Sequence, residues 1–169
     1  ANIINDISGG RRDPDILNVV SEFSSPFVIT HSRGNSITMN DLASYENIIN
    51  EIKYELCCLT EIALKKGISI ENIIWDPGLG FAKNTAQNLY ILEHLEMFTK
   101  EKFPLLVGPS RKRFIGDVLK ETNSQERIWG TAAVVCRCVQ AGVSVVRVHD
   151  VNIISKTIDM SNVLWPKKL

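Results

Sequence analysis

The chain has 169 residues, enough for one hydrophobic core of ordinary size. Nineteen lysine and arginine residues balance nineteen aspartate and glutamate residues, so the formal net charge is zero. That balance argues against a general nucleic-acid or membrane-surface binder, which needs a large positive excess. The sequence contains no run of about 18 apolar residues, so it predicts no membrane-spanning helix.

The first part of the chain alternates between strand and helix patterns. A short strand is expected at 2–6, and a helix follows at about 13–23, where proline and aspartate mark its start. A second strand at 26–30 ends in a polar loop. A long amphipathic helix is then expected over about 41–66, closed by Gly67.

The rest of the chain repeats the same order three more times. The strands are expected at 73–76, 104–108 and 143–148, and the helices at about 85–99, from about 111, at about 123–140 and at 151–161. Short apolar strands followed by helices are typical of buried parallel strands. Two architectures fit this pattern: an open five-stranded sheet with helices on both faces, or part of a (β/α)8 barrel, which needs about 250 residues when whole.

One domain over residues 1–169 is expected, because the sequence contains no linker, internal repeat or low-complexity tract. The chain opens within a strand pattern, which indicates a start inside a longer protein. Its cysteines stand as adjacent Cys57-Cys58 and as Cys136-x-Cys138. Neither spacing is that of a zinc site, so reduced thiols in a cytosol-like compartment are predicted.

Polar residues end two of the expected strands, at the edge where α/β proteins bind ligands. Asn5 shares a strand face with Ile3, and Asp76 shares one with Ile74. An amide and a carboxylate at that edge suit a flat, nitrogen-rich ring, because a carboxylate accepts two parallel N–H bonds. Either residue equally suits a turn, since each precedes a glycine-containing loop.

Cations end the last two strands. Lys112 lies in the segment Gly-Pro-Ser-Arg-Lys-Arg that follows the strand at 104–108, and Arg147 and His149 share a face of the final strand. Two such strand ends indicate a phosphate or pyrophosphate ligand. The alternatives are a solvated helix start and a structural ion pair. Cations at a helix N-terminus are unfavourable without a bound anion, however, and buried strands seldom carry unpaired arginine.

Five segments, taken in chain order, resemble motifs of the dihydropteroate synthase family. They are Ile4 through Gly9, Thr30 through Gly34, Asp76 through Asn84, Gly108 through Gly116, and Arg147 through Val151. The resemblance implies an α/β fold, a TIM-type (β/α)8 barrel, of which this chain supplies an incomplete portion of about five βα units with a parallel sheet. Four residues depart from the family's pattern: Thr30, Ser32, Ala82 and Pro109.

The resemblance also implies a reaction. The family consists of transferases of folate biosynthesis, targets of sulfonamides, which condense 7,8-dihydropterin-6-ylmethyl diphosphate with p-aminobenzoate to give 7,8-dihydropteroate and diphosphate. Asp76 and Lys112 match catalytic residues, and with Asn5 they match the pterin-binding set. The remaining matches are Arg147 and His149 for the diphosphate, and Phe81, Ser110 and Arg113 for the aminobenzoate pocket.

The family's first three strands lie outside the resemblance. Magnesium is therefore expected with its protein ligand in that preceding part and with none in this chain, and the chain alone is expected to form no product. The composition resembles that of multifunctional folate-synthesis proteins of eukaryotic microbes. We also expect a homodimer when the protein is complete, and a cytoplasmic or alternatively mitochondrial location.

Two alternatives to that function stay open. One is a non-catalytic fragment that only completes the barrel of a larger chain. The other is a pterin-binding methyltransferase on a related barrel. The cationic strand ends argue against the methyltransferase, because a methyl carrier has no pyrophosphate to hold.

Overall fold

The strands form one continuous parallel arc in the computed structural model, which describes residues 1–166. They are β1 (Ile4–Asp6), β2 (Phe27–Thr30), β3 (Ile73–Asp76), β4 (Leu106–Val107) and β5 (Val145–Val146). β1 pairs with β2, β2 with β3, and β4 with β5, all in parallel. A parallel bridge between Trp75 and Leu105 joins the two groups, so the spatial order follows the chain order throughout.

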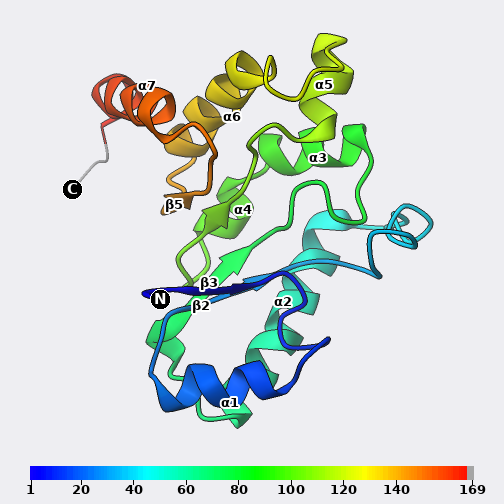
Figure 1. Ribbon diagram of the computed structural model, residues 1–169, viewed down its shortest axis with the longest axis vertical. Coiled ribbons are helices and arrows are strands. Elements are labelled where there is room, and N and C mark those ends of the chain that lie inside the picture. The colour runs from blue at the N-terminus through cyan, green and yellow to red at the C-terminus, as the bar shows by residue number, and fades with distance from the viewer. Residues whose placement is uncertain (167–169) are drawn as a thin grey trace.

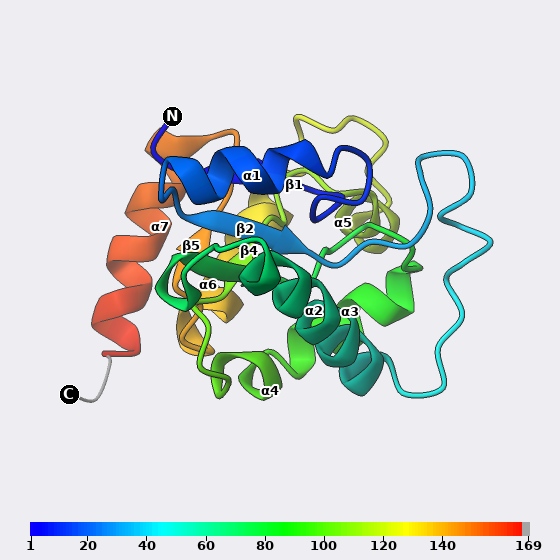
Figure 2. The same cartoon turned by 90° about the horizontal axis from the view of Figure 1, so that it is seen from below.

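Helices follow the strands and lie around the arc. They are α1 (Asp15–Glu22), α2 (Ile48–Lys65), the short 3₁₀ helix η1 (Ile70–Asn72), α3 (Thr85–Glu93), α4 (Glu96–Thr99), α5 (Arg113–Leu119), α6 (Ile128–Gln140) and α7 (Val151–Leu164). Figure 1 shows α1 and α2 at one end of the arc and α6 and α7 at the other, and Figure 2 shows the same arrangement from below.

This strand order decides between the two architectures that the sequence left open. An open doubly wound sheet reverses its strand order at a switch point, whereas the order here never reverses. Right-handed crossovers that always advance in one direction place every helix on the same side of the strands. The fold is therefore an incomplete portion of a (β/α)8 barrel, as expected.

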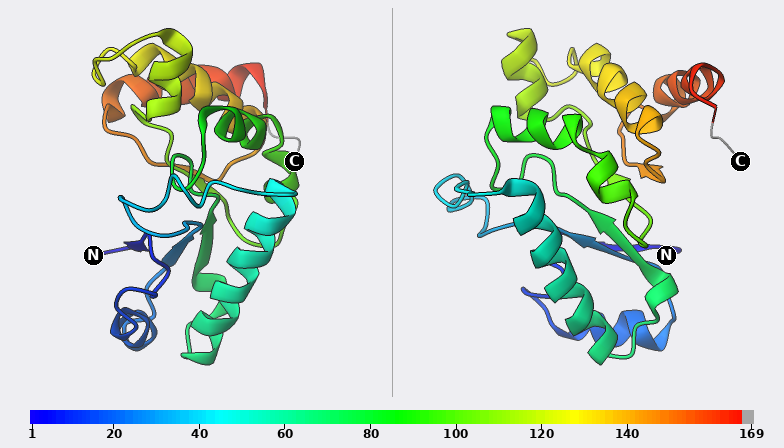
Figure 3. Two further views of the ribbon diagram at one scale, coloured as in Figure 1. Left: turned by 90° about the vertical axis from the view of Figure 1, so that its right-hand side faces the viewer. Right: turned by 180° about the vertical axis from the view of Figure 1, so that it is seen from behind.

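The expected helix at 41–66 was too long, because α2 begins only at Ile48. Asn47 caps it: the side-chain oxygen accepts a hydrogen bond from the Asn50 N–H at 3.1 Å. Glu51 accepts from the N–H groups of Asn47 and its predecessor, which closes the helix start. The preceding segment instead forms turns and projects from the body of the molecule (Figure 3).

Two further helices differ from the expected ranges. The helix at 85–99 is interrupted at His94, which ends α3 and whose ring Nδ1 lies 2.8 Å from the carbonyl oxygen of Tyr90. Asn123 does not cap α6, because its side chain accepts from the Gln125 N–H at 3.0 Å and forms a local turn. In both places local side-chain bonding to the backbone ends or delays a helix that periodicity predicted.

The hydrophobic core lies between the strands and the helices. Trp75 is its largest fully buried residue; its ring stacks on Phe103 with 4.5 Å between centroids. The indole N–H donates to Thr60 Oγ1 of α2 at 2.9 Å, which fixes α2 on β3. Because side chains alternate along a strand, Asn5 and Asp76 lie on the opposite face, toward the barrel interior.

β1 and β5 are the outer strands of the arc, and within residues 1–166 neither has a strand partner on its outer side. Ile3 and Val145 are accordingly exposed, at 46% and 36%. Open parallel edges favour association, so these two edges are where further strands would pair.

Within residues 1–166, no helix combines the length and the apolar composition that a membrane span requires.

Candidate functional site

The loop after β3 is built around Asp76. Its carboxylate is only 2% exposed, and Oδ1 accepts a hydrogen bond from the Gly78 N–H at 2.8 Å. Gly78 has a φ of +68°, and a Cβ at that position would lie 1.9 Å from the carbonyl oxygen of His31. Only glycine fits this close approach, so the Asp-Pro-Gly sequence sets the turn that aims Asp76.

Burial dominates the electrostatics of Asp76 and raises the pKa of its carboxyl above the ordinary value. The Gly78 N–H and the charges of Arg147, Lys83 and Lys112 act in the opposite direction. Among the described residues, Oδ2 accepts no hydrogen bond, so one carboxylate oxygen serves the turn and the other has no partner within the fold.

Lys112 and Phe81 meet at the same end of the strands. The Lys112 Nζ lies 4.2 Å from the centroid of the Phe81 ring, a cation–π distance. A Cβ at Gly80 would come within 3.1 Å of the lysine stem, so this glycine makes room for it. Burial lowers the pKa of Lys112, while the carboxylate of Asp76 opposes that shift.

Arg147 and His149 surround a separate cavity at the ends of β4 and β5. Its volume is about 370 Å³, and its lining comprises Gly108, Ser110, Lys112, Arg147, Val148 and His149. Ser110 Oγ accepts the His149 N–H at 3.2 Å and lies 2.8 Å from the imidazole Nδ1, which orients the ring. A Cβ at Gly108 would lie 3.1 Å from Arg147 Nη2, so glycine allows the guanidinium to cross the strand end.

The rival interpretation of Arg147 was a structural ion pair. Across residues 1–166, Arg147 makes no salt bridge, and the side chain is exposed to solvent at the cavity. Two cationic side chains and an imidazole therefore line one cavity, and none of its lining residues is a carboxylate. This is the arrangement that binds an anion carrying several oxygen atoms.

Asn5 and Asp6 play different roles at the end of β1. Asp6 forms a turn: its carboxylate accepts from the Ser8 N–H at 3.0 Å, the Ser8 hydroxyl at 2.6 Å and the Gly10 N–H at 2.7 Å. Burial opposes ionisation of Asp6, but these hydrogen bonds outweigh it and hold its pKa below the ordinary value. Asn5 pairs in register with Val28 and faces the barrel interior, exposed.

Only one of the three consecutive cations after β4 reaches the site. Arg111 forms a two-bond pair with Asp150, at 3.1 and 2.6 Å, and so joins the start of α5 to the start of α7. Arg113 is 82% exposed and lies 3.9 Å from Asp117 on its own helix. Lys112 between them is the cation that enters the cavity.

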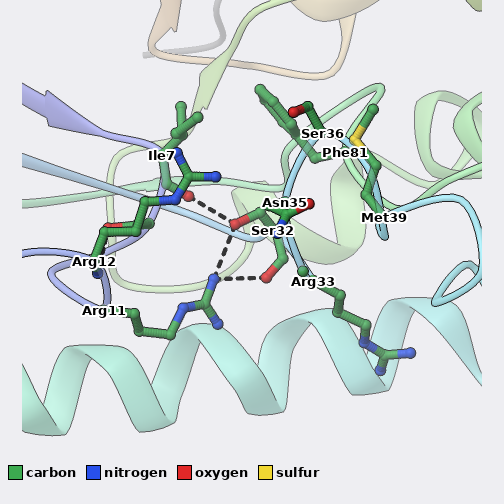
Figure 4. Close-up of a pocket in the computed structure, with 11 residues that line it drawn as sticks. Ile7, Arg11, Arg12, Ser32, Arg33, Asn35, Ser36, Met39 and Phe81 are labelled. Atoms are coloured by element: carbon green, nitrogen blue, oxygen red, sulfur yellow. Dashed lines mark hydrogen bonds between the residues drawn. The ribbon is translucent and has the colours of Figure 1, made fainter.

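The three residues matched to an aminobenzoate pocket line three different cavities. Ser110 lies in the cavity with Arg147, and Arg113 borders a groove beside α3. Phe81 lines a cavity of about 230 Å³ whose other walls include Ile7, Met39 and two arginines of the loop after β1 (Figure 4). Their joint role therefore stays a prediction that depends on the rest of the barrel.

The cavity in Figure 4 is lined by arginines that were not among the predicted site residues. Arg11 donates through Nη2 to the Ser32 carbonyl at 2.6 Å and to the Ser32 hydroxyl at 2.9 Å, which links the loops after β1 and β2. Arg33 points away from the cavity toward α2, where it pairs with Glu51 at 2.8 Å and with Glu55. Both arginines are thus engaged within the fold.

Sequence reasoning also missed Lys83. Its Nζ is buried under the loop after β3, where burial lowers the pKa of Lys83 to about 7. The His31 imidazole beside it has its pKa lowered to about 4 by burial. Lys83 lies within the segment Asp76 through Asn84 that resembles a family motif, but no role was predicted for it.

Magnesium was expected with its ligand outside this chain. Within the part of the chain that the structure describes, no three His, Cys, Asp or Glu side chains gather closely enough to hold a metal ion. The described residues therefore supply no cluster of three such ligands for it.

Comparison with known proteins agrees with this geometry. A family model described as "Pterin binding enzyme" matches residues 1–149. The dihydropteroate synthase of Synechocystis is 41% identical over 98% of this chain and 57% of its own length. The folic acid synthesis protein fol1 of Pneumocystis carinii is 44% identical over 98% of this chain and 23% of its own.

A solved structure is similar over nearly the whole chain. The dihydropteroate synthase of Thermus thermophilus in complex with 6HMPPP gives a TM-score of 0.90 at 30% identity, covering 98% of this chain and 65% of that one. This chain spans about half of the length of the Synechocystis relative, so it corresponds to part of those proteins. With the family model matched from Ala1 into the last strand end, this chain belongs to the family of pterin-binding enzymes.

Proposed function

We propose that the chain is the C-terminal part of a dihydropteroate synthase domain, with residues 1–169 belonging to one barrel. The complete enzyme would join a dihydropterin methyl diphosphate to p-aminobenzoate. The observation that carries this proposal is the meeting of Asp76, Lys112, Arg147 and His149 at the carboxyl ends of β3, β4 and β5. Residues 167–169 lie outside the described residues.

Asp76 would bind the pterin ring. Its free carboxylate oxygen faces the barrel interior and suits the adjacent N–H groups of an aminopyrimidine. Because the carboxylate is buried, such a bond forms in a medium of low dielectric constant, where it is stronger than in water. Asn5, on the same interior face, would supply an amide to another edge of the ring.

Arg147 and His149 would bind the diphosphate. In the reaction, the amine nitrogen of p-aminobenzoate forms a bond to the pterin methylene carbon, the carbon–oxygen bond to diphosphate breaks, and the amine loses a proton. Negative charge grows on the departing diphosphate. Preorganised cations around that charge stabilise the transition state, and Ser110 keeps the imidazole in place for this purpose.

Lys112 and Phe81 would define the side from which the arylamine approaches. The lysine ammonium lies between the Phe81 ring and the diphosphate cavity, which gives it contacts with both regions. Ser110 and Arg113 are proposed to complete the aminobenzoate pocket when the remaining loops are present. The Thermus relative was solved with 6HMPPP, which supports a pterin substrate for this chain.

Three features of the complete protein are proposals from the family alone. Magnesium would be held by residues that precede β1. The complete protein would form a homodimer. Its compartment would be the cytoplasm, or the mitochondrion in the alternative.

The alternatives are less well supported. A methyltransferase would have no use for the cationic cavity formed by Arg147 and His149, since a methyl carrier bears no diphosphate. A non-catalytic fragment remains compatible with the two open strand edges. Those edges predict that the isolated chain forms no product even if the complete protein does.

The test compares the complete protein with the isolated 169-residue chain. Each would be incubated with dihydropterin methyl diphosphate and p-aminobenzoate, and both dihydropteroate and diphosphate would be measured. We expect equal amounts of the two products from the complete protein and none from the chain. Absence of product from a folded complete protein would refute the function, and turnover by the monomeric chain would refute the need for the missing strands.

A further inference from the structure

Lys83 is a buried lysine whose nitrogen contacts only uncharged groups. The side chain is 7% exposed, and Nζ donates to the carbonyl oxygens of Gly78 at 3.0 Å and Phe81 at 2.9 Å. It also lies 2.8 Å from Nδ1 of His31. These three partners occupy all three donors of an ammonium group. Within the described chain, no carboxylate lies at salt-bridge distance from Nζ.

Burying an ammonium among neutral groups costs free energy that an apolar side chain of the same length would not. The hydrogen bonds of Lys83 must therefore secure something that packing alone does not. Both carbonyl groups belong to the loop of residues 77–82. The N–H of Gly78 in that loop holds Asp76, and the ring of Phe81 in the same loop contacts Lys112.

A second donor holds the same loop further along. Ala82 has a φ of +49°, in the left-handed region that a residue with a Cβ adopts only when its surroundings hold it there. Its carbonyl oxygen accepts the Tyr45 hydroxyl at 2.9 Å, and the Arg33 guanidinium lies 4.0 Å from the Tyr45 ring. Lys83 and Tyr45 together thus bind the carbonyls of residues 78, 81 and 82.

We propose that Lys83 is a positioning residue that holds loop 77–82, so that the Phe81 ring and the Asp76 carboxylate keep a fixed relation to Lys112. This deepens the proposed function and rests on it. The loop bears Phe81, which we propose to face the arylamine, and its Gly78 N–H holds Asp76. Arg147 and His149 follow β5 and keep their geometry.

The protonation state of Lys83 adds a signature. The charged and titratable groups around it are His31 after β2, Asp76 on β3, Glu55 on α2, Arg33 after β2 and Lys112 after β4. Burial lowers the pKa of Lys83 to about 7, with Asp76 and Glu55 opposing the shift. Burial keeps His31 neutral at that pH, so its Nδ1 accepts a bond from Lys83 and its Nε2, 3.1 Å from Glu55, carries the proton. This Nε2 contact is close, but it is not aligned as a hydrogen bond.

Loss of a proton from Lys83 leaves two donors for three acceptors. The hydrogen bonding of Lys83 to the loop should therefore weaken as pH rises through about 7. The free energy of unfolding, by contrast, should rise over the same increase in pH. Because the pKa of Lys83 is lower in the folded protein than in the unfolded chain, the unfolded chain binds more protons between pH 7 and 10.5, and the free energy of unfolding rises with pH in that window. A merely structural lysine would not separate these two trends.

The experiment uses the complete protein with Lys83→Met, and two matched variants. Tyr45→Phe removes the hydrogen bond to the Ala82 carbonyl without altering a group that titrates near neutrality, and Lys66→Met changes an exposed lysine. The KM for p-aminobenzoate, the KM for the pterin diphosphate and kcat would be measured from about pH 6 to 8.5, on either side of the Lys83 pKa. Hydrogen exchange of the amides in 77–82 would be followed in parallel.

We expect the wild-type KM for p-aminobenzoate to rise across this pH range. In Lys83→Met it should be about tenfold higher at pH 6, the equivalent of one strong hydrogen bond, and nearly independent of pH. Tyr45→Phe should raise that KM but keep the pH dependence, and Lys66→Met should match wild type. Exchange in 77–82 should be faster in both loop variants.

An unchanged KM, pH profile and loop exchange in folded Lys83→Met would overturn the proposal. If that variant does not fold, Lys83→Gln, which retains two donors, takes its place, and the same outcomes decide. A wild-type protein that turns over neither substrate would refute the proposed function instead. In that case loop exchange alone would still test whether Lys83 holds residues 77–82.

Discussion

Replacing Asp76 with asparagine in the complete protein separates a ligand-binding carboxylate from one that merely forms a turn. Asparagine has the same shape, and its Oδ1 can still accept the Gly78 N–H that now binds at 2.8 Å. The substitution removes the negative charge. It also places an amide donor where the free carboxylate oxygen stands, facing the barrel interior.

Binding of a pterin should weaken markedly. The ring N–H groups would lose a charge-assisted partner, and one buried donor would face another. These effects together cost on the order of 2–4 kcal/mol, or about 30- to 800-fold in the dissociation constant.

Stability should change in the opposite sense. Burial raises the pKa of Asp76 above its unfolded value of 3.8. The contribution of this group to the unfolding free energy is therefore fully present below pH 3.8 and is lost as pH rises through the folded pKa. Asparagine carries no charge to desolvate. Asp76→Asn is therefore expected to be at least as stable as wild type at pH 7, with its advantage vanishing near pH 4.

Asp6→Asn is the matched control. Hydrogen bonds from Ser8 and Gly10 outweigh the burial of Asp6 and lower its pKa, so its contribution is present above pH 3.8 and is lost as pH falls through the folded pKa. This variant should lose stability at pH 7 and bind pterin more nearly like wild type. Calorimetric titration with a bare pterin and urea unfolding at pH 4 and 7 measure both quantities. Pterin affinity of Asp76→Asn within twofold of wild type would show that Asp76 only forms a turn.

Three further substitutions test the fold and the anion cavity. Gly78→Ala would bring a Cβ to 1.9 Å from a backbone carbonyl and should lower the unfolding free energy by more than about 2 kcal/mol. Gly142→Ala, which has a similar φ but open space around it, should lower the unfolding free energy by about 1 kcal/mol. Equal urea midpoints for the two variants would contradict this. Arg147→Ala should weaken the binding of diphosphate and of the diphosphate-bearing pterin alike, and leave the binding of a bare pterin unchanged, as measured by calorimetric titration. An equal loss of affinity for all three ligands would refute the anion role. Thr60→Val leaves the buried Trp75 indole N–H without its acceptor and should lower the unfolding free energy by about 1–3 kcal/mol, which an unchanged urea midpoint would disprove.

Much of the site could be predicted from the sequence because strand geometry is local. Side chains alternate along a strand, so Asp76 could be placed on a face and at a carboxyl end without knowledge of the strand's neighbours. The same argument placed Arg147 and His149 together, and the structure brings both to one cavity. Helix boundaries were less predictable, because Asn47 and Asn123 compete for backbone donors in ways that periodicity does not report.

The barrel arc was decided only by tertiary structure. Alternating strands and helices suit an open sheet as well as a barrel, and the distinction lies in which strands pair. The bridge between Trp75 and Leu105 joins strands that are separated by a helical segment, and it keeps the order sequential. No local pattern in either strand encodes its neighbour, since parallel pairing depends on contacts distant in the chain.

The charges of the site show the same division. Sequence alone determined that three cations follow β4, but they are alike by residue type and position. Asp150, 39 residues away, neutralises Arg111, solvent surrounds Arg113, and Lys112 alone reaches the cavity. Lys83 became a candidate only when the fold placed it beneath the loop of the site. Sequence specifies which groups a segment carries and which face they take, whereas a charge is available for function only if no distant partner neutralises it, and that depends on the folded chain.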